Sequence, residues 1–218
     1  MADVISVASF TVAMAALATL VMLPPGVAVA WLLARRRFPG RAVLETLVSL
    51  PLVLPPVATG LILLKLVGRR GPVGALLERF GIELVFTWRA VVLAMAVMGL
   101  PLLVRAAREG FEQVDRRYEQ IAATLGASPT RVFFSVSLPL ARRGVLAGAL
   151  LGFSRALGEF GATILVAGAL PSTRTIAVAI YSYTETGQDA AATTMLLVSA
   201  TIAFGALMLS NRVAASAR

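Results

Sequence analysis

Four stretches of this chain run without a charged residue for long enough to cross a lipid bilayer or most of it. They are Val4 to Ala34, Thr46 to Leu64, Ala90 to Val104 and Ala190 to Ser210. The hydrocarbon core is about 30 Å thick and takes about 20 helical residues to cross. A fifth apolar stretch, from Gly144 to Thr173, is interrupted only by Arg155 and Glu159. These lengths predict an all-α, polytopic membrane protein.

We expect a single membrane domain over residues 4–212, with five spans and no soluble domain. The spans are predicted at about 5–34, 46–67, 87–105, 144–170 and 190–211. Five crossings place the two termini on opposite sides of the membrane. A hydrophobic content of 58% and a mean hydropathy of +0.86 over 218 residues agree with this class.

The chain has a net charge of +9, and the distribution of its basic residues between the predicted loops explains this excess. With the N-terminus outside, thirteen basic residues fall on the cytoplasmic side and six outside, as the positive-inside rule requires. The cytoplasmic set is Arg35, Arg36, Arg37, Arg41, Arg105, Arg108, Arg116, Arg117, Arg131, Arg142, Arg143, Arg212 and Arg218. Because these residues lie at predicted span ends, the charge indicates a bacterial plasma-membrane topology and not nucleic-acid binding.

The first span is expected to be retained and not cleaved as a signal peptide. Its leading region carries Asp3 and no basic residue, and its apolar run is about twice the usual length of a signal-peptide core. Cysteine and histidine are absent from the whole chain. Their absence argues against covalent catalysis and most transition-metal sites, so we expect no catalytic, cofactor or metal residues.

Prolines divide two of the predicted spans. Pro24 and Pro25 are expected to kink or break the first span near its middle. The second span contains three prolines within six residues, Pro51, Pro55 and Pro56, which predict a bent or partly unwound stretch. Such a stretch either lines a transport pathway or simply caps the start of a helix.

The fourth span carries two patterns. Small residues recur at Gly144, Gly148, Gly152 and Ala156, which predicts a face for close helix packing, either within one chain or at a dimer seam. Arg155 and Glu159 are four residues apart and can neutralise each other, and Thr163 extends the same stripe by one turn. This polar line indicates either an anion pathway, together with Pro55, Pro56 and Thr59, or a buried structural ion pair.

A polar insertion at residues 118–139, here called the elbow, separates the third and fourth spans. Its sequence predicts a short helix over 118–125, a left-handed stop at Gly126, and a second helix from Pro129 to Ser137 capped by Ser128. The two helices are expected to present an apolar ridge. It is formed by Ile121, Ala122, Leu125, Val132, Phe133 and Val136. The ridge suits either a groove on a partner protein or the lipid surface.

The elbow resembles the coupling loop of ATP-binding-cassette importer permeases. The resemblance rests on Glu119, Gln120, Ala122, Ala123, Gly126, Arg131, Val136, Leu138 and Pro139. Gln120 stands where glutamate is usual, Ile121 replaces the first alanine and Val136 replaces isoleucine. The stretches 50–56, 68–71 and 155–163 are similar to the molybdate branch of that class, whereas sulfate permeases usually differ after Glu159.

This resemblance implies a type I importer core of five helices with cytoplasmic coupling helices. It also implies a homodimer, two cytoplasmic ATPase subunits that bind ATP and magnesium, and an external oxyanion-binding protein. The segment from Val67 to Trp88, rich in glycine, would be either a contact for that protein or a connector. Molybdate is the expected substrate, with tungstate an equivalent tetrahedral dianion.

Three alternatives remain beside this interpretation. A sulfate or thiosulfate permease belongs to the same class. A secondary anion transporter would need intramembrane acids for ion coupling, and only Glu159 is available. A membrane-embedded enzyme would need paired carboxylates, histidine or cysteine within the spans. The chain cannot itself be the ATPase, because its single lysine, Lys65, lies between two leucines and not in a phosphate-binding loop.

Overall fold

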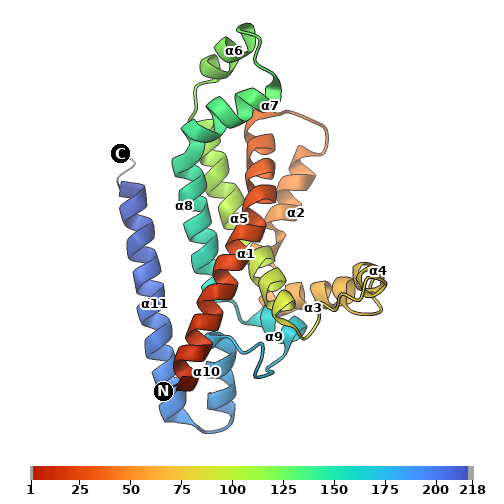
Figure 1. Cartoon of the computed structure of the whole chain (residues 1–218), viewed down its shortest axis with the longest axis vertical. Coiled ribbons are helices and arrows are strands. Elements are labelled where there is room, and N and C mark those ends of the chain that lie inside the picture. The colour runs from red at the N-terminus through yellow and green to blue at the C-terminus, as the bar shows by residue number, and fades with distance from the viewer. Residues whose placement is uncertain (1, 216–218) are drawn as a thin grey trace.

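The computed structural model describes residues 2–215, with side chains for residues 3–208. Every regular element in this range is helical, as the sequence predicts. Four long helices follow the long axis of the molecule (Figure 1). They are α1 (Ala2–Arg35), α5 (Trp88–Glu112), α8 (Leu138–Leu157) and α11 (Asp189–Ala215). The side chain of Arg212 and all of Arg218, both assigned above to the cytoplasmic side, lie outside the described residues.

The packed core lies between α1, α5 and α8, and the glycines of α8 allow the close approach. A Cβ atom added to Gly144 would lie 2.5 Å from the Cα of Gly110 on α5. One added to Gly148 would lie 2.7 Å from the carbonyl oxygen of Leu103. Gly152 is also buried. The small-residue stripe is therefore a packing face within one chain, and not a seam left open for a second copy.

Replacing Gly148 with leucine should separate α5 from α8, because the nearest atoms belong to the backbone of Leu103 and Ala107 and cannot move aside. Overpacking of this kind costs about 1–3 kcal/mol. We expect a lower midpoint of thermal unfolding for the full chain in detergent. Gly205→Leu is the matched control, since none of the described atoms lies within 4 Å of a Cβ there. Equal midpoints for the two variants would contradict the close crossing.

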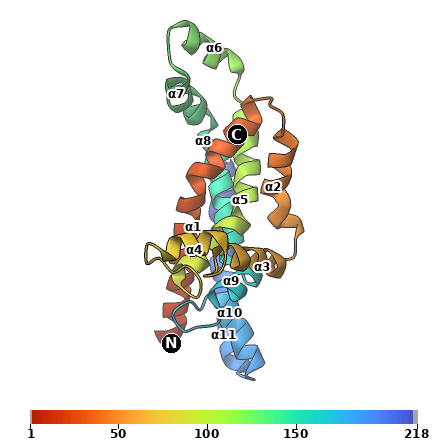
Figure 2. The same cartoon turned by 90° about the vertical axis from the view of Figure 1, so that its right-hand side faces the viewer.

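The first helix is continuous through Pro24 and Pro25, so of the two expected outcomes, a kink or a break, the break does not occur. The helix instead changes direction along its length in both views (Figures 1 and 2). Met22 and Val27 are buried in the core on either side of the prolines. This packing holds the two halves together even though the prolines remove two backbone donors.

The second predicted span, 46–67, is two helices and not one. Helix α2 (Arg41–Val53) and helix α3 (Pro56–Val67) meet at an angle of 118°. Figure 2 shows α2 running beside α5 and α3 turning across the bundle toward α4 (Pro72–Glu78). The break falls at Leu54 and Pro55, which confirms the bent stretch predicted from the prolines.

The fourth predicted span, 144–170, is likewise not a single helix. Helix α8 ends at Leu157, with Gly158 as its cap, and a separate helix α9 (Gly161–Ala167) follows. The chain then forms α10 (Ile176–Glu185) before the last long helix, α11. Glycine at 158 and 161 interrupts the apolar run, because it favours neither helix continuation nor a fixed backbone angle.

The arrangement has two distinct ends (Figure 1). The start of α1 and helix α10 lie at one end, and the elbow lies at the other end, to which α11 returns. Among the described residues, four helices are long and apolar enough to cross a membrane, or up to five if the bent pair α2–α3 counts as one span. The chain therefore traverses the bundle repeatedly and presents the elbow at one face.

Candidate functional site

The elbow forms where local sequence signals end one helix and start another. Helix α6 (Arg116–Thr124) begins after Asp115, whose carboxylate accepts the Arg117 N–H at 2.9 Å. Gly126 has a φ of 85°, so the chain turns there in the left-handed region. Ser128 caps the next helix, α7 (Pro129–Val132), by accepting the Arg131 N–H at 3.4 Å. The predicted helix, glycine turn and helix are confirmed.

The second limb of the elbow does not stop at Ser137. Helix α7 passes into a π-helical turn, Phe133–Ser137, and then directly into α8. Pro139 explains this turn, because it lacks the N–H that an α-helix would direct to the carbonyl of Ser135. The expected end of the limb at Ser137 is therefore wrong, and the elbow is a rigid extension of the fourth spanning helix.

The exposed apolar surface of the elbow differs from the predicted ridge. Tyr118, Ile121 and Leu125 share one face of α6, and Leu125 is 83% exposed. Phe134 is exposed on the second limb. Phe133 points the other way, because its ring packs 5.5 Å from that of Trp31 and 6.2 Å from that of Phe111. The outward ridge thus consists of residues 118, 121, 125 and 134.

The other residues predicted for the coupling loop lie at different depths. Gln120, Ala123, Gly126, Arg131 and Pro139 are exposed, and Ala122, Val132, Val136 and Leu138 are half-buried. The exposed members lie on the same protruding element as the apolar ridge. The elbow therefore offers hydrophobic, amide and guanidinium groups together, as a protein-binding surface does.

Glu119 lies at the base of the elbow and not on its outer face. Its Oε1 lies 3.0 Å from the Nε of Arg35 and accepts the Ser137 hydroxyl at 2.7 Å. Arg35 also donates from Nη2 to the carbonyl oxygen of Val114 at 2.9 Å. The side chains of Arg35 and Glu119 are only 6% and 19% exposed. Glu119 thus ties α6 to the end of α1 and to the π-helical turn.

Arg35 is a residue of this site that sequence reasoning missed. Its position in the sequence is far from the elbow and indicates only a place in the positive cytoplasmic edge. An acidic residue in the first turn of α6 opposite a basic residue at the end of α1 gave no local signal. Only the packing of the two helix ends brings the charges together.

A second candidate region lies where the two broken spans meet. A Cβ atom on Gly161, at the start of α9, would lie 2.7 Å from the Cβ of Pro56 at the start of α3. One on Gly60 would lie 2.8 Å from the Cα of Ala162. The breaks α2–α3 and α8–α9 are therefore packed against each other. We call this contact the junction (residues 54–60 and 158–163).

The residues predicted to line a pathway are distributed around the junction. Pro55 and Pro56 are exposed, whereas Thr59 and Thr163 are buried. Within the described part of the chain, neither threonine hydroxyl has a hydrogen-bond partner. Thr163 belongs to α9 and not to α8, so the predicted continuous stripe from Arg155 through Glu159 to Thr163 does not exist.

Arg155 and Glu159 form the ion pair that their spacing predicts. The Nη2 of Arg155 lies 2.8 Å from the Oε2 of Glu159. The other carboxylate oxygen of Glu159, Oε1, accepts the Ala162 N–H at 2.8 Å and so caps the first turn of α9. Glu159 is 1% exposed and Arg155 is 26% exposed. The pair therefore holds the end of α8 to the start of α9.

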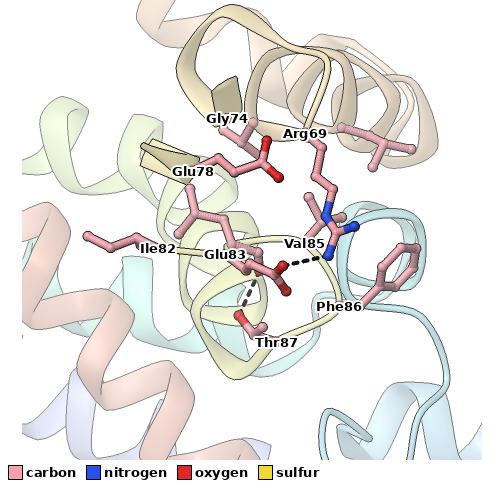
Figure 3. Close-up of a pocket in the computed structure, with 12 residues that line it drawn as sticks. Arg69, Gly74, Glu78, Ile82, Glu83, Val85, Phe86 and Thr87 are labelled. Carbon is pink, nitrogen blue, oxygen red and sulfur yellow. Dashed lines mark hydrogen bonds and ion pairs between the residues drawn. The ribbon is translucent and has the colours of Figure 1, made fainter. Parts of the chain in front are cut away.

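A cavity of about 450 Å³ opens at α3, α4 and the loop before α5. Figure 3 shows Arg69 reaching across it to Glu83, with Phe86 beside them. Phe86 adopts a φ of 60°, and its N–H donates to the carbonyl oxygen of Val166 at 2.9 Å. This loop is thus attached to the end of α9, the helix that Glu159 caps.

The sequence matches a protein family over residues 26–215, almost the whole described chain. The family is described as "Binding-protein-dependent transport system inner membrane component". The match includes the elbow and both halves of the junction. The two regions therefore belong to one recognised architecture.

Two curated relatives share this similarity along nine tenths of their length or more. The "Molybdenum transport system permease protein ModB" of Escherichia coli (strain K12) is 47% identical over 205 residues, which cover 93% of this chain and 90% of the relative. The protein of the same name from Haemophilus influenzae is 44% identical over 210 residues, 95% of this chain and 92% of the relative.

Solved structures agree on the fold. A chain of the MetNI methionine ABC transporter, in inward facing conformations, matches with a TM-score of 0.72 at 16% identity and covers 99% of this chain. A chain of a bacterial ABC transporter involved in import of the acidic polysaccharide alginate matches with a TM-score of 0.66 over 97% of this chain. At these identities the likeness concerns architecture alone.

Proposed function

Because the chain belongs to the family of binding-protein-dependent transport system inner membrane components, we propose that it is the permease subunit of an ATP-driven molybdate importer. The observation that carries the substrate is identity of 44–47%, over more than nine tenths of the chain, to relatives named as molybdenum transport permeases. The fold of several apolar helices agrees with a multi-pass protein of the inner membrane.

The elbow is the surface that would receive the cassette ATPase. Its ridge at residues 118, 121, 125 and 134 projects beyond the helix bundle and is apolar, and Arg131 adds a charge beside it. An apolar helix face in a groove of a partner is a common recognition mode. ATP and magnesium would bind to that partner, and the permease would contribute no catalytic residue.

Rigidity of the elbow supports a mechanical role. Its second limb is continuous with α8, and Glu119 ties its first limb to Arg35 on α1. Movement of the elbow by closing ATPases would therefore displace two spanning helices together. Such rigid-body motion is how alternating access works in transporters with a fixed central passage.

The remaining partners follow from the same assignment. A homodimer would enclose the passage between two copies, and a binding protein would deliver the oxyanion at the end opposite the elbow. In this orientation the elbow and the end of α11 are cytoplasmic, and the start of α1 is external. The passage is proposed to include Pro55, Pro56, Thr59, Arg155 and Thr163, with Glu159 beside them.

The direct test is the ATPase activity of the genetically adjacent cassette subunit, reconstituted with this chain and its binding protein. Molybdate is expected to stimulate hydrolysis, with tungstate acting as its near equivalent. Stimulation by sulfate alone would keep the class and overturn the substrate. Failure of the cassette subunit to associate would overturn the class of importer.

Leu125→Glu tests the docking surface. A charge at this position, on the most exposed apolar side chain of the elbow, should raise the dissociation constant of the cassette subunit at least about 30-fold, equivalent to a loss of about 2 kcal/mol. Binding to the reconstituted permease is the measurement. Phe80→Glu is the matched control, because Phe80 is also well exposed but lies after α4, far from the elbow.

A further inference from the structure

The two carboxylate oxygens of Glu159 serve different groups. Oε1 accepts the Ala162 N–H and so belongs to the start of α9. Oε2 faces Arg155 at 2.8 Å but receives no hydrogen bond from the described residues, so the ion pair is held by charge without a well-directed donor. Arg155 can therefore leave Glu159 without releasing the cap on α9. The contact with Arg155 and the contact with the Ala162 N–H use different oxygens, so one can break while the other remains.

Arg155 has capacity for a second partner. A guanidinium group carries five N–H donors, and the 2.8 Å approach of Arg155 to Glu159 is made by the Nη2 atom. Its side chain is 26% exposed, whereas that of Glu159 is almost wholly buried. A charged side chain inside a membrane faces a partner or a watery cavity, and not lipid. The free donors of Arg155 therefore point to a passage or to a second copy of the chain.

Contacts other than the ion pair with Arg155 also hold the carboxylate of Glu159 in place. Glu159 sits just before the first turn of α9, where the hydrogen bond from the Ala162 N–H favours a negative charge. Its position is further fixed by the close packing of Gly161 on Pro56. Glu159 is thus a stationary anion beside a cation that retains freedom to move.

We propose that Arg155 binds the transported oxyanion and that Glu159 is a tethered counter-ion which occupies Arg155 when no oxyanion is present. The inference rests on the proposed import function and assigns separate roles to the two residues. A tetrahedral dianion can accept two parallel N–H bonds from a guanidinium group, which a single chloride cannot do. Competition with Glu159 would keep binding weak and let the oxyanion leave.

The test is equilibrium binding of radioactive molybdate to the full-length permease in nanodiscs of phosphatidylcholine, at constant ionic strength. Glu159→Gln keeps an oxygen for the Ala162 N–H but removes the competing charge. This variant should bind molybdate at least about tenfold more tightly than the wild type, because the oxyanion no longer competes with a carboxylate for Arg155; tenfold is about 1.4 kcal/mol. The matched control, Arg155→Gln with Glu159→Gln, should lose the gain.

A gain that requires Arg155 supports the counter-ion role, since a merely structural ion pair would not tighten binding when broken. Equal binding by Glu159→Gln and the double variant would overturn it. If Glu159→Gln is not recovered as folded protein, Glu159→Ala gives the same comparison without the cap. Import by the wild-type transporter is measured separately. Successful import without the gain would overturn only this inference, whereas failed import would overturn the proposed function.

Discussion

Replacing Glu119 with alanine should detach the elbow from the end of α1 and abolish ATP-driven uptake. The change leaves the buried guanidinium of Arg35 without its counter-charge, and it removes the acceptor of the Ser137 hydroxyl. Breaking a buried ion pair by removing one partner costs about 3–5 kcal/mol. Thermal unfolding of the full chain in detergent and uptake by the reconstituted transporter would measure the two effects.

Two controls separate this tie from a loss of docking contacts. Gln120→Ala alters the neighbouring exposed residue and should leave the unfolding midpoint unchanged. Arg35→Met combined with Glu119→Met removes both charges and should recover most of the lost stability, because apolar replacements often match a buried pair. If the Glu119→Ala variant were as stable as the wild type, the ion pair between Arg35 and Glu119 would not be what holds the elbow to α1.

The elbow was predictable because its signals are local. Gly126 ends α6 in the conformation that glycine permits most easily, and Ser128 with Pro129 starts the next limb. The break at Pro55 was predictable for the same reason, since each proline constrains its own backbone and that of the residue before it. Neither feature needs knowledge of a distant part of the chain.

The failures have a common physical origin in packing. Pro24 and Pro25 carry the same local signal as Pro55, yet α1 changes direction without breaking (Figure 1), because buried residues on both sides hold it in the core. Phe133 was placed on the outer ridge by helical spacing, but the π-helical turn and the ring of Trp31 bring it inward. Neither the core packing around Pro24 and Pro25 nor the contact of Phe133 with Trp31 can be predicted from local sequence patterns alone.

The division of the fourth span was accessible in principle. Gly158 and Gly161 flank Glu159, and two glycines so close together weaken a helix. The i, i+4 spacing of the charged residues correctly predicts the pair but wrongly extends the line to Thr163, which belongs to α9. The cap on Ala162 was not predictable, since it depends on the turn that the glycines create.

Gly126→Pro should uncouple ATP hydrolysis from uptake while leaving membrane insertion intact. Proline fixes φ near −65°, whereas Gly126 requires 85°. It would also remove the N–H that Gly126 donates to Ala123, and it would disfavour the near-helical backbone of Leu125, the residue before it. The two limbs could then no longer hold their present angle, and uptake should fall at least about tenfold, a coupling loss of about 1.4 kcal/mol or more.

The matched variant Gly126→Ala isolates the backbone from the volume of the side chain. In the described part of the chain no atom lies within 4 Å of a Cβ at this position, so alanine meets only the left-handed strain of about 1–2 kcal/mol. We expect alanine to retain most uptake and proline to lose it, with the amount of permease in the membrane equal for both by immunoblot. Normal uptake by the proline variant would mean that the elbow does not transmit movement through this turn, because insertion and docking residues are unchanged.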